Sequence, residues 1–128
     1  AVPHYTVTAA VIQRGDQVLI AQRPQGGLLG GLWEFPGGKL EDTDPDLRAC
    51  LRREIREELG AEISVGEALG MYKHAYTHFR ITLHAFACAL LPGQNAQESQ
   101  KVRWVRPDEL PGFAMGKVDR LIAQRLQA

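Results

Sequence analysis

Three glutamates in a predicted helix are spaced so that they can share a divalent cation. Residues 53–60 read Arg-Glu-Ile-Arg-Glu-Glu-Leu-Gly, which places Glu54, Glu57 and Glu58 at positions i, i+3 and i+4. On a helix these positions share one face, where like charges repel by roughly 0.2–0.5 kcal/mol per pair. A cation that prefers oxygen ligands, such as Mg²⁺ or Mn²⁺, would remove that repulsion. The alternative is a solvated helix face on which neighbouring arginines pair with the glutamates.

Two glycines just before this helix suit the approach of a phosphate. They stand in the run Gly37-Gly38-Lys39. Glycine lets the backbone bend tightly and come close to a ligand, and the exposed N–H and C=O groups can face a phosphate–metal cluster. A glycine-rich segment that leads into a carboxylate-bearing helix therefore predicts a site for a metal-bound pyrophosphate group.

The helix that carries the glutamates has clear sequence signals at both ends. Asp44 suits the N-cap and Pro45 the first helical position, while Gly60 is typical of a helix C-terminus. Between them, aliphatic residues recur every four positions from Leu47 to Leu59. This spacing predicts one apolar face that packs on a core.

The rest of the chain is mostly strand-like, with one further helix. Residues 7–12 and 18–20 flank a Gly-Asp turn and predict a hairpin. The remaining expectations are a glycine-rich loop at 24–31, strands at 32–35, 63–69, 72–76, 81–91 and 102–105, a polar loop at 92–100, a turn or short helix from Pro107, and a C-terminal helix containing Leu121, Ile122 and Leu126. This order predicts an α+β fold with a mixed β-sheet sandwiched between helices (α/β/α), in a single domain spanning 1–128.

Composition excludes several classes of protein. Hydrophobic residues make up 45% and charged residues 23%, which excludes disorder, collagen-like repeats and a coiled coil as the whole structure. Fifteen basic residues balance fifteen acidic ones, which disfavours a general nucleic-acid or membrane binder. Cys50 and Cys88 stand among apolar residues and are expected to be reduced core thiols. With no signal peptide or transmembrane run in view, we expect a cytoplasmic monomer.

Residues 38–61 resemble the Nudix box, the motif G-x5-E-x7-R-E-U-x-E-E-x-G-U, in which U is a bulky aliphatic residue. The run from Arg53 to Gly60 matches every specified position. The first half departs from the motif, because Asp44 stands where the motif has Glu and eight residues rather than seven separate it from Arg53. Ala61 is also smaller than the usual last aliphatic residue. The longer spacing leaves the role of Asp44 open.

The resemblance extends over nearly the whole chain. Residues 17–39 are similar to MutT-type pyrophosphohydrolases and, more closely, to the C-terminal domain of MutY-type adenine DNA glycosylases. Residues 74–84 and 103–119 are similar to that same glycosylase domain. The resemblance therefore implies a Nudix fold.

The resemblance also implies a reaction and the residues that carry it. Water attacks a phosphorus of a nucleoside diphosphate linked to another group, with Mg²⁺ (Mn²⁺ as the alternative) held by the three helix glutamates and the Gly38 carbonyl. Arg53 would orient Glu54, which is either a metal ligand or the general base. Glu98, the only carboxylate in the loop before the last strand, is the other candidate for the base.

Four further predictions concern substrate binding. By similarity Arg23 contacts the phosphates or sugar, and Lys39 can reach a phosphate; each is otherwise a surface residue. Phe35 and Phe79 are among the aromatic residues expected to offer a face on which a base stacks. Asp119, at the start of the last helix, can accept from the N1–H and 2-amino groups of guanine, and its alternative role is that of a favourable acidic residue at a helix N-terminus.

Two functions of different class remain. The first is a MutT-like enzyme that hydrolyses (d)NTPs, including oxidised guanine nucleotides such as 8-oxo-dGTP, to the monophosphate and pyrophosphate. The second is a DNA-binding domain that reads 8-oxoguanine within a larger adenine glycosylase, with the segment around Tyr76 in the reading loop. All three helix glutamates are present, and a pure reader does not need them, so the sequence favours the enzyme.

Overall fold

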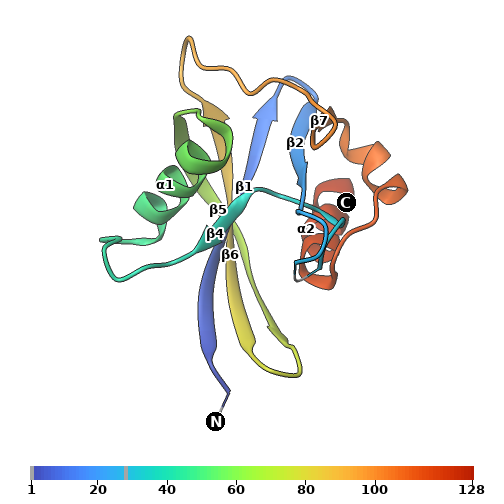
Figure 1. The fold of residues 1–128 in the computed structure, drawn as a ribbon. Helices are drawn as coiled ribbons and strands as arrows, with labels where there is room; N and C mark the ends of the chain where they lie inside the picture. The colour runs from blue at the N-terminus through green and yellow to red at the C-terminus, as the bar shows by residue number, and fades with distance from the viewer. Residues whose placement is uncertain (1, 28) are drawn as a thin grey trace.

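A seven-stranded mixed sheet forms the centre of the molecule, and one long helix lies on each of its faces (Figure 1). The computed structural model describes residues 2–27 and 29–128; position 28, inside the predicted glycine-rich loop, lies outside the described residues. The elements in chain order are β1 (His4–Arg14), β2 (Gln17–Gln22), β3 (Trp33–Glu34), β4 (Gly37–Lys39), α1 (Leu47–Leu59), β5 (Ile63–Ala75), β6 (Arg80–Leu90), β7 (Val102–Val105), the 3₁₀ helix η1 (Pro107–Gly112) and α2 (Lys117–Gln127). The predicted α+β class is confirmed.

Strand β1 organises the sheet because it pairs with three neighbours. It runs parallel to β6 along most of its length. Its C-terminal end forms the predicted hairpin with β2, and its N-terminal half pairs with β4. The main order is β3-β2-β1-β6-β5, and β7 pairs with the free side of β2. Because β1 changes partner midway, β4 and the helix after it lie directly beside the middle of the sheet.

The alternation of side chains along β1 builds two separate cores. Ala9 and Val11 point to the face covered by α2 and pack in a cluster that includes Ile122 of that helix. Ala10 and Ile12 point to the opposite face and pack in a cluster with residues of α1 such as Leu51. Alternate residues of one strand therefore hold both helices in place. Within residues 2–27 and 29–128, no helix is long and apolar enough to span a bilayer.

The start of α1 differs from the sequence expectation. Asp46, not Asp44, is the N-cap, and its carboxylate accepts a hydrogen bond of 2.8 Å from the backbone N–H of Ala49. At the other end Gly60 is the C-terminal residue as predicted, with a left-handed φ of 63°. The helix begins two residues later than expected, and this frees Asp44 for another contact.

Two expectations for strands were also incomplete. The segments 63–69 and 72–76 form one strand, β5, whose pairing with β6 shifts register twice rather than breaking at Gly70. Gly37 and Gly38 were expected in a tight bend, but both lie in the extended strand β4. Their role in the structure is the close approach described below.

Candidate active site

Strand β4 passes so close to β1 and α1 that two of its residues have no room for a side chain. A Cβ on Gly37 would overlap the carbonyl oxygen of Thr8 in β1. A Cβ on Gly38 would overlap the carboxylate of Glu54 in α1. The two glycines therefore let the glutamate-bearing face of α1 lie against the backbone of β4.

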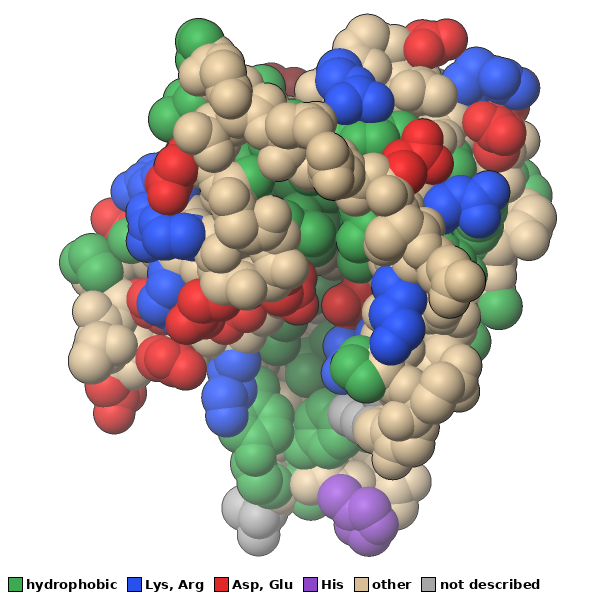
Figure 2. All heavy atoms as spheres, turned by 45° about the horizontal axis from the view of Figure 1, so that its top comes forward, with side chains coloured by type: hydrophobic (Ala, Val, Ile, Leu, Met, Phe, Trp, Pro, Cys, Tyr) green, Lys and Arg blue, Asp and Glu red, His purple; other side chains and the backbone are tan. Residues whose placement is uncertain are grey.

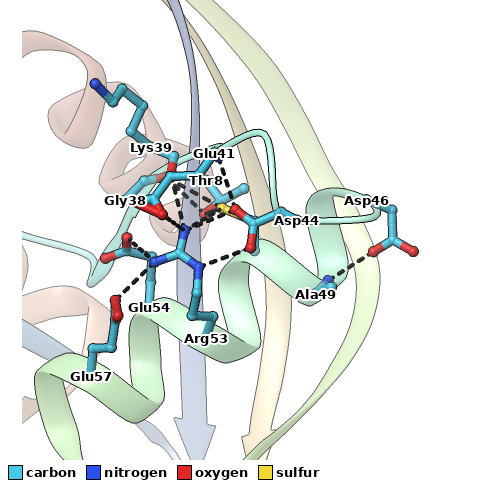
Figure 3. A network of polar contacts seen from close by, with 11 residues as sticks. Thr8, Gly38, Lys39, Glu41, Asp44, Asp46, Ala49, Arg53, Glu54 and Glu57 are labelled. Carbon is cyan, nitrogen blue, oxygen red and sulfur yellow. Dashed lines mark hydrogen bonds and ion pairs between the residues drawn. The ribbon is translucent and has the colours of Figure 1, made fainter.

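Arg53 ties this face of α1 to the loop that precedes it (Figure 3). Its guanidinium donates two hydrogen bonds of 2.8 Å to the carboxylate of Asp44, from Nε and from Nη2. Its Nη1 donates to Glu54 at 2.9 Å and to Glu57 at 2.8 Å. Its Nη2 also donates to the carbonyl of Lys39. Arg53 is thus placed to orient Glu54, and the same contacts fix the strand, the loop and the helix relative to one another.

The loop residue Asp44 has the lowest exposure among the carboxylate partners of Arg53. Its side chain is only 4% exposed. The hydrogen bonds from Arg53 hold the pKa of Asp44 well below its ordinary range and keep it ionised. Asp44 pairs with Arg53 although it is one residue further away than the motif specifies.

Glu58 lies where negative charge accumulates. Burial of its carboxyl, together with repulsion from Glu34 and Glu54, raises the pKa of Glu58 to about 7. A hydrogen bond from the backbone N–H of Gly37 acts in the opposite direction. The glutamates near β4 therefore carry more negative charge than the surrounding basic groups neutralise.

Glu34 is a candidate site residue that sequence reasoning missed. It lies in β3, its side chain is 17% exposed, and it forms an ion pair of 2.8 Å with Arg23 of the neighbouring segment. Burial raises its pKa, Arg23 lowers it, and Glu54 adds repulsion. The available signal was a charged residue inside the otherwise apolar run Leu-Trp-Glu-Phe. Arg23, predicted to contact substrate, is thereby brought beside the acidic cluster.

Asp119 connects the first turn of α2 to the backbone next to Glu34. Its Oδ1 accepts a hydrogen bond of 3.0 Å from the backbone N–H of Phe35. Burial, helped by repulsion from Glu34, raises the pKa of Asp119 to about 7. The charge of Asp119 also raises the pKa of the Tyr76 hydroxyl, second to burial, so the two groups lie near each other.

The expectation that the ring of Phe35 lines the cleft is wrong. Phe35 is 2% exposed and packs in the core between the sheet and α2. Only its backbone faces Asp119. Trp33, two residues earlier, packs edge-on against Phe113 with ring centroids 5.4 Å apart.

A group of three aromatic rings lies beyond Asp119, where β1 and the β5–β6 hairpin meet. Phe79 stacks on Tyr76 at 4.7 Å and contacts Tyr5 at 5.9 Å. The ammonium group of Lys39 lies 4.6 Å from the ring centre of Tyr5. Two predicted substrate residues, Phe79 and Lys39, therefore meet at this aromatic group, and the partly exposed rings offer the stacking surface that Phe35 does not.

Glu98, the predicted alternative general base, lies near the C-terminal end of α1. It lines a hollow of about 580 Å³ together with Glu58 and neighbouring residues of the loop before β7. Its side chain is half exposed, and Arg103 approaches it to 3.7 Å. The structure therefore places Glu98 in the same hollow as one of the three helix glutamates.

The donor set suits a hard divalent cation, although its members are held apart. In the part of the chain that the structure describes, no three His, Cys, Asp or Glu side chains converge on one point as they stand. Arg53 holds Glu54 and Glu57, whereas Glu58 has a raised pKa because of its acidic neighbours. Oxygen ligands with uncompensated negative charge match Mg²⁺ or Mn²⁺. Figure 2 shows the acidic side chains gathered along a hollow that also exposes basic and apolar surface.

Comparison with known proteins gives consistent results. The family described as "NUDIX domain" matches residues 7–125. A "CTP pyrophosphohydrolase" of Escherichia coli (strain K12) is 40% identical over 114 residues, covering 88% of this chain and 84% of that protein. An "8-oxo-dGTP diphosphatase" of Proteus vulgaris is 42% identical over 81 residues, covering 62% and 71%. The solved structure described as "Solution structure of the E. coli ORF135 protein" superposes with a TM-score of 0.81 at 35% identity, covering 98% of this chain and 90% of that one.

The similarity to adenine DNA glycosylases is real but partial. The mouse "Adenine DNA glycosylase" is 30% identical over 132 residues, which cover 96% of this chain and only 26% of that protein. The chain thus corresponds to about a quarter of such a glycosylase.

Proposed function

This chain belongs to the NUDIX family and is a Nudix hydrolase, and we propose that it hydrolyses nucleoside triphosphates to the monophosphate and pyrophosphate with Mg²⁺ as its cofactor. The observation that carries the proposal is the contact between α1 and β4, where Gly38 has no side chain and the carboxylate of Glu54 fills the space. This contact brings a row of carboxylates against a strand whose backbone is open to a ligand. Mn²⁺ is the alternative metal.

The three helix glutamates, Glu54, Glu57 and Glu58, would hold the metal. When bound, a divalent cation supplies charge neutralisation on the phosphates and a lower pKa for the attacking water. Arg53 orients Glu54 by the 2.9 Å hydrogen bond. The proton of the attacking water passes to Glu54 or Glu98. A pH–rate profile of Glu98→Gln separates the two, since the loss of its acidic limb without weaker Mg²⁺ binding identifies Glu98 as the base.

The backbone ligand is better assigned to Gly37 than to Gly38. The oxygen of Gly38 accepts from the hydroxyl of Thr8 at 3.1 Å. The Pro36 carbonyl accepts from the Ala10 N–H, and the Leu40 N–H donates to the Thr6 carbonyl, so hydrogen-bonded pairs fall at even positions. Gly37, opposite Ala9, therefore forms a non-hydrogen-bonded pair with β1. Its polar groups point away from β1, and its N–H reaches Glu58. We propose the Gly37 carbonyl as the free oxygen.

The base is read by Asp119, and the phosphates or sugar by Arg23. An ionised carboxylate offers about four lone-pair positions, and Phe35 takes one of them. The remainder can accept from the N1–H and 2-amino groups of a guanine-type base, including 8-oxoguanine. Phe79 and Tyr76 supply the stacking surface, and Lys39 stands beside them.

A cytosine nucleotide is the second candidate substrate, because the raised pKa of Asp119 makes its neutral form accessible near pH 7. A neutral carboxyl donates one hydrogen bond and accepts another, which matches N3 and the 4-amino group of cytosine. The charged groups that face Asp119 are Glu34 and Arg23, with Tyr76 close by. The ratio of kcat/KM for guanine nucleotides to kcat/KM for cytosine nucleotides should therefore increase as the pH rises from 6 to 8.

The test is a product assay with dGTP, 8-oxo-dGTP, dCTP and CTP, each with Mg²⁺ and with EDTA. Release of pyrophosphate that requires the metal supports the proposal. The ratio of the kcat/KM values identifies the preferred nucleobase. In Asp119→Ala, KM for the preferred base should rise more than KM for the others, while Asp108→Ala, at an exposed ion-paired site, serves as the control. No release from any nucleotide, with tight binding to duplex DNA containing 8-oxoguanine, would reverse the assignment in favour of a glycosylase domain.

A further inference from the structure

A hollow of about 280 Å³ lies at the open end of the sheet, away from the carboxylates. In Figure 1 the ends of β1, β5 and β6 extend beyond both helices, toward the bottom of the view. The hollow is lined by His4 and by residues 73–75 and 80–82. We call it the basic hollow.

Strand register shows which side chains share this face. His4 lies beside Arg80, which pairs with Ala75, and the next row pairs Thr82 with Lys73. Because side chains alternate along a strand, these residues share the face on which α1 packs further up the sheet. The small Ala75 and the buried Thr82 form a floor, with longer basic side chains around it.

The basic hollow is distinct from the candidate active site. Tyr5 and Ile81 stand at the alternate positions of the same strands and point to the face of α2. Tyr5 contacts Phe79 in the aromatic group on that side. His74 and Ile81, which also line the hollow, pair with each other at alternate positions, and the His74 ring contacts Tyr76 at 4.6 Å. The hollow therefore borders the aromatic group at one edge, while Lys73 and Arg80 lie on the opposite face of the sheet.

Lys73 and Arg80, the two cations of the basic hollow, have no side-chain partner within the part of the chain that the structure describes. Among the described residues, every arginine side chain except Arg52 and Arg80 has a hydrogen bond, an ion pair or an aromatic ring as a partner. Arg80 and Lys73 are exposed, and no ion pair joins either of them to a described carboxylate. None of the residues that line the hollow is acidic, although the chain as a whole has equal numbers of acidic and basic residues.

The lining groups suit the oxygens of a phosphate. Arg80 offers a planar fork of donors and Lys73 a compact point charge, both suited to phosphate oxygens. The imidazole of His4 shares a 2.7 Å hydrogen bond with the Thr82 hydroxyl, which fixes the ring at the rim. At about 280 Å³ the hollow is smaller than most pockets for whole organic ligands, so it suits a phosphate group rather than a nucleoside.

We propose that the basic hollow, between Lys73, Arg80 and His4, is a second anion site that binds a phosphate-bearing ligand on the face opposite the aromatic group. The phosphate can belong to free pyrophosphate or to the backbone of a nucleic acid strand. The proposal does not depend on the hydrolytic activity.

The test is an NMR titration of the ¹⁵N-labelled protein in EDTA, so that no metal recruits phosphate to the glutamates. The probes are inorganic phosphate, pyrophosphate and a single-stranded 12-nucleotide thymidine oligomer. Amide shifts should centre on Thr82 and its neighbours for at least one probe. Lys73→Gln/Arg80→Gln should weaken that binding at least about tenfold, because the variant removes two charge-assisted hydrogen-bond donors.

Arg52→Gln is the matched control, since Arg52 lacks a polar partner but lies on α1, and it should bind as the wild type does. Tighter binding of the oligomer, with a steep salt dependence, identifies a nucleic acid as the source of the phosphate; binding of pyrophosphate alone identifies the free anion. Shifts that miss the hollow, or an affinity equal in the double variant and the wild type, would overturn the proposal.

Discussion

The two halves of the candidate site, which we call the carboxylate half and the base half, are held together in different ways. In the carboxylate half, on β4 and α1, Arg53 makes all its contacts within 14 residues of chain, and two of its partners, Glu57 and Glu41, are more than half exposed. In the base half, Asp119 reaches Phe35 across 84 residues, and the ring of Phe35 is buried. The first half is a short local network of charges, whereas the second is assembled by the packing of α2 on the sheet.

This difference separates activity from stability. In the carboxylate half burial, together with repulsion from Glu34 and Glu54, raises the pKa of Glu58 and opposes folding with Glu58 ionised, whereas Arg53 stabilises Glu54 and Glu57. Removing the charge of Glu58 should lower activity while keeping or raising stability. In the base half a variant changes a buried contact, so its effects on activity and stability should be linked.

The largest effect is expected for Glu58→Gln. Losing a charged ligand should lower kcat/KM at least about a hundredfold. Loss of a residue that only hydrogen-bonds to a metal ligand typically costs about 10–100-fold, and loss of a ligand itself should cost at least as much. The same variant should unfold at a higher urea concentration than the wild type at pH 8, because it removes a buried charge and its repulsion with Glu34 and Glu54. Steady-state kinetics and urea unfolding measure the two quantities. Glu62→Gln, which alters an exposed pair with Arg56 outside the cluster, is the control. Near-normal Mg²⁺-dependent turnover by Glu58→Gln would contradict the ligand assignment.

A smaller loss is expected for Asp44→Ala, because Asp44 acts through Arg53. Without the two 2.8 Å hydrogen bonds, the guanidinium is free to turn away from Glu54. Loss of an outer partner typically costs about 10–100-fold, which we expect in kcat with little change in KM. Asp42→Ala, in the same loop but exposed, should be unaffected. Equal kcat values for Asp44→Ala and Asp42→Ala would show that Arg53 keeps its position unaided.

The carboxylate half was largely predictable from the sequence because its geometry is local. The spacing of Glu54, Glu57 and Glu58 alone fixes their common helix face, and the structure agrees with it. The pairing of Asp44 with Arg53 was not predictable, since the loop absorbs one extra residue by a path that spacing does not encode. The N-cap was misplaced for the same reason, because Asp44 and Asp46 are equally good cap residues by type.

The base half could be predicted only in part. Strand β3 has two residues, too short to show which of Trp33, Glu34 and Phe35 points inward, so the burial of Phe35 and the site position of Glu34 were missed. Asp119 was identified as a base-reading candidate by resemblance, but its bond to the Phe35 backbone depends on how α2 packs. Gly70 looked like a break between strands and proved to be an irregularity within β5.

A pH-dependent effect on stability is expected from Asp119. Burial raises its pKa in the folded state to about 7, above the ordinary value of about 4 in the unfolded chain. The folded state therefore binds more protons than the unfolded state between these values, and the free energy of unfolding falls as the pH rises from about 4 to about 7. At about 1.4 kcal/mol per pKa unit, a shift from about 4 to about 7 makes the contribution of Asp119 a loss of roughly 4 kcal/mol.

The variant Asp119→Asn isolates this contribution. Asparagine can still accept from the Phe35 N–H but does not titrate, so the stability of the variant relative to the wild type should improve as the pH rises and level off above about 7. Urea unfolding at a series of pH values from 4 to 8.5 measures the difference. Asp108→Asn, at an exposed position of η1, should follow the wild type at every pH. If the free energies of unfolding of Asp119→Asn and the wild type changed in parallel with pH, ionisation of Asp119 would not destabilise the folded state.

The smallest effect is expected for Asp46→Ala, which tests whether the N-terminal cap of α1 is independent of the Arg53 network. Asp46 caps α1 by accepting from the Ala49 N–H at 2.8 Å and makes no contact with Arg53. Asp44, two residues earlier, pairs with Arg53 and does not cap the helix. Loss of an aspartate cap costs about 1 kcal/mol of stability, which corresponds to a fall in Tm of roughly 4 °C for a domain of this size. Since the guanidinium keeps its partners, kcat should stay within about twofold of the wild type. Asp46→Asn should restore the Tm, because asparagine caps helices equally well. If Asp46→Ala instead lowered kcat as far as Asp44→Ala does, the position of the glutamates would depend on the first turn of α1, and the cap and the Arg53 network would be one unit rather than two.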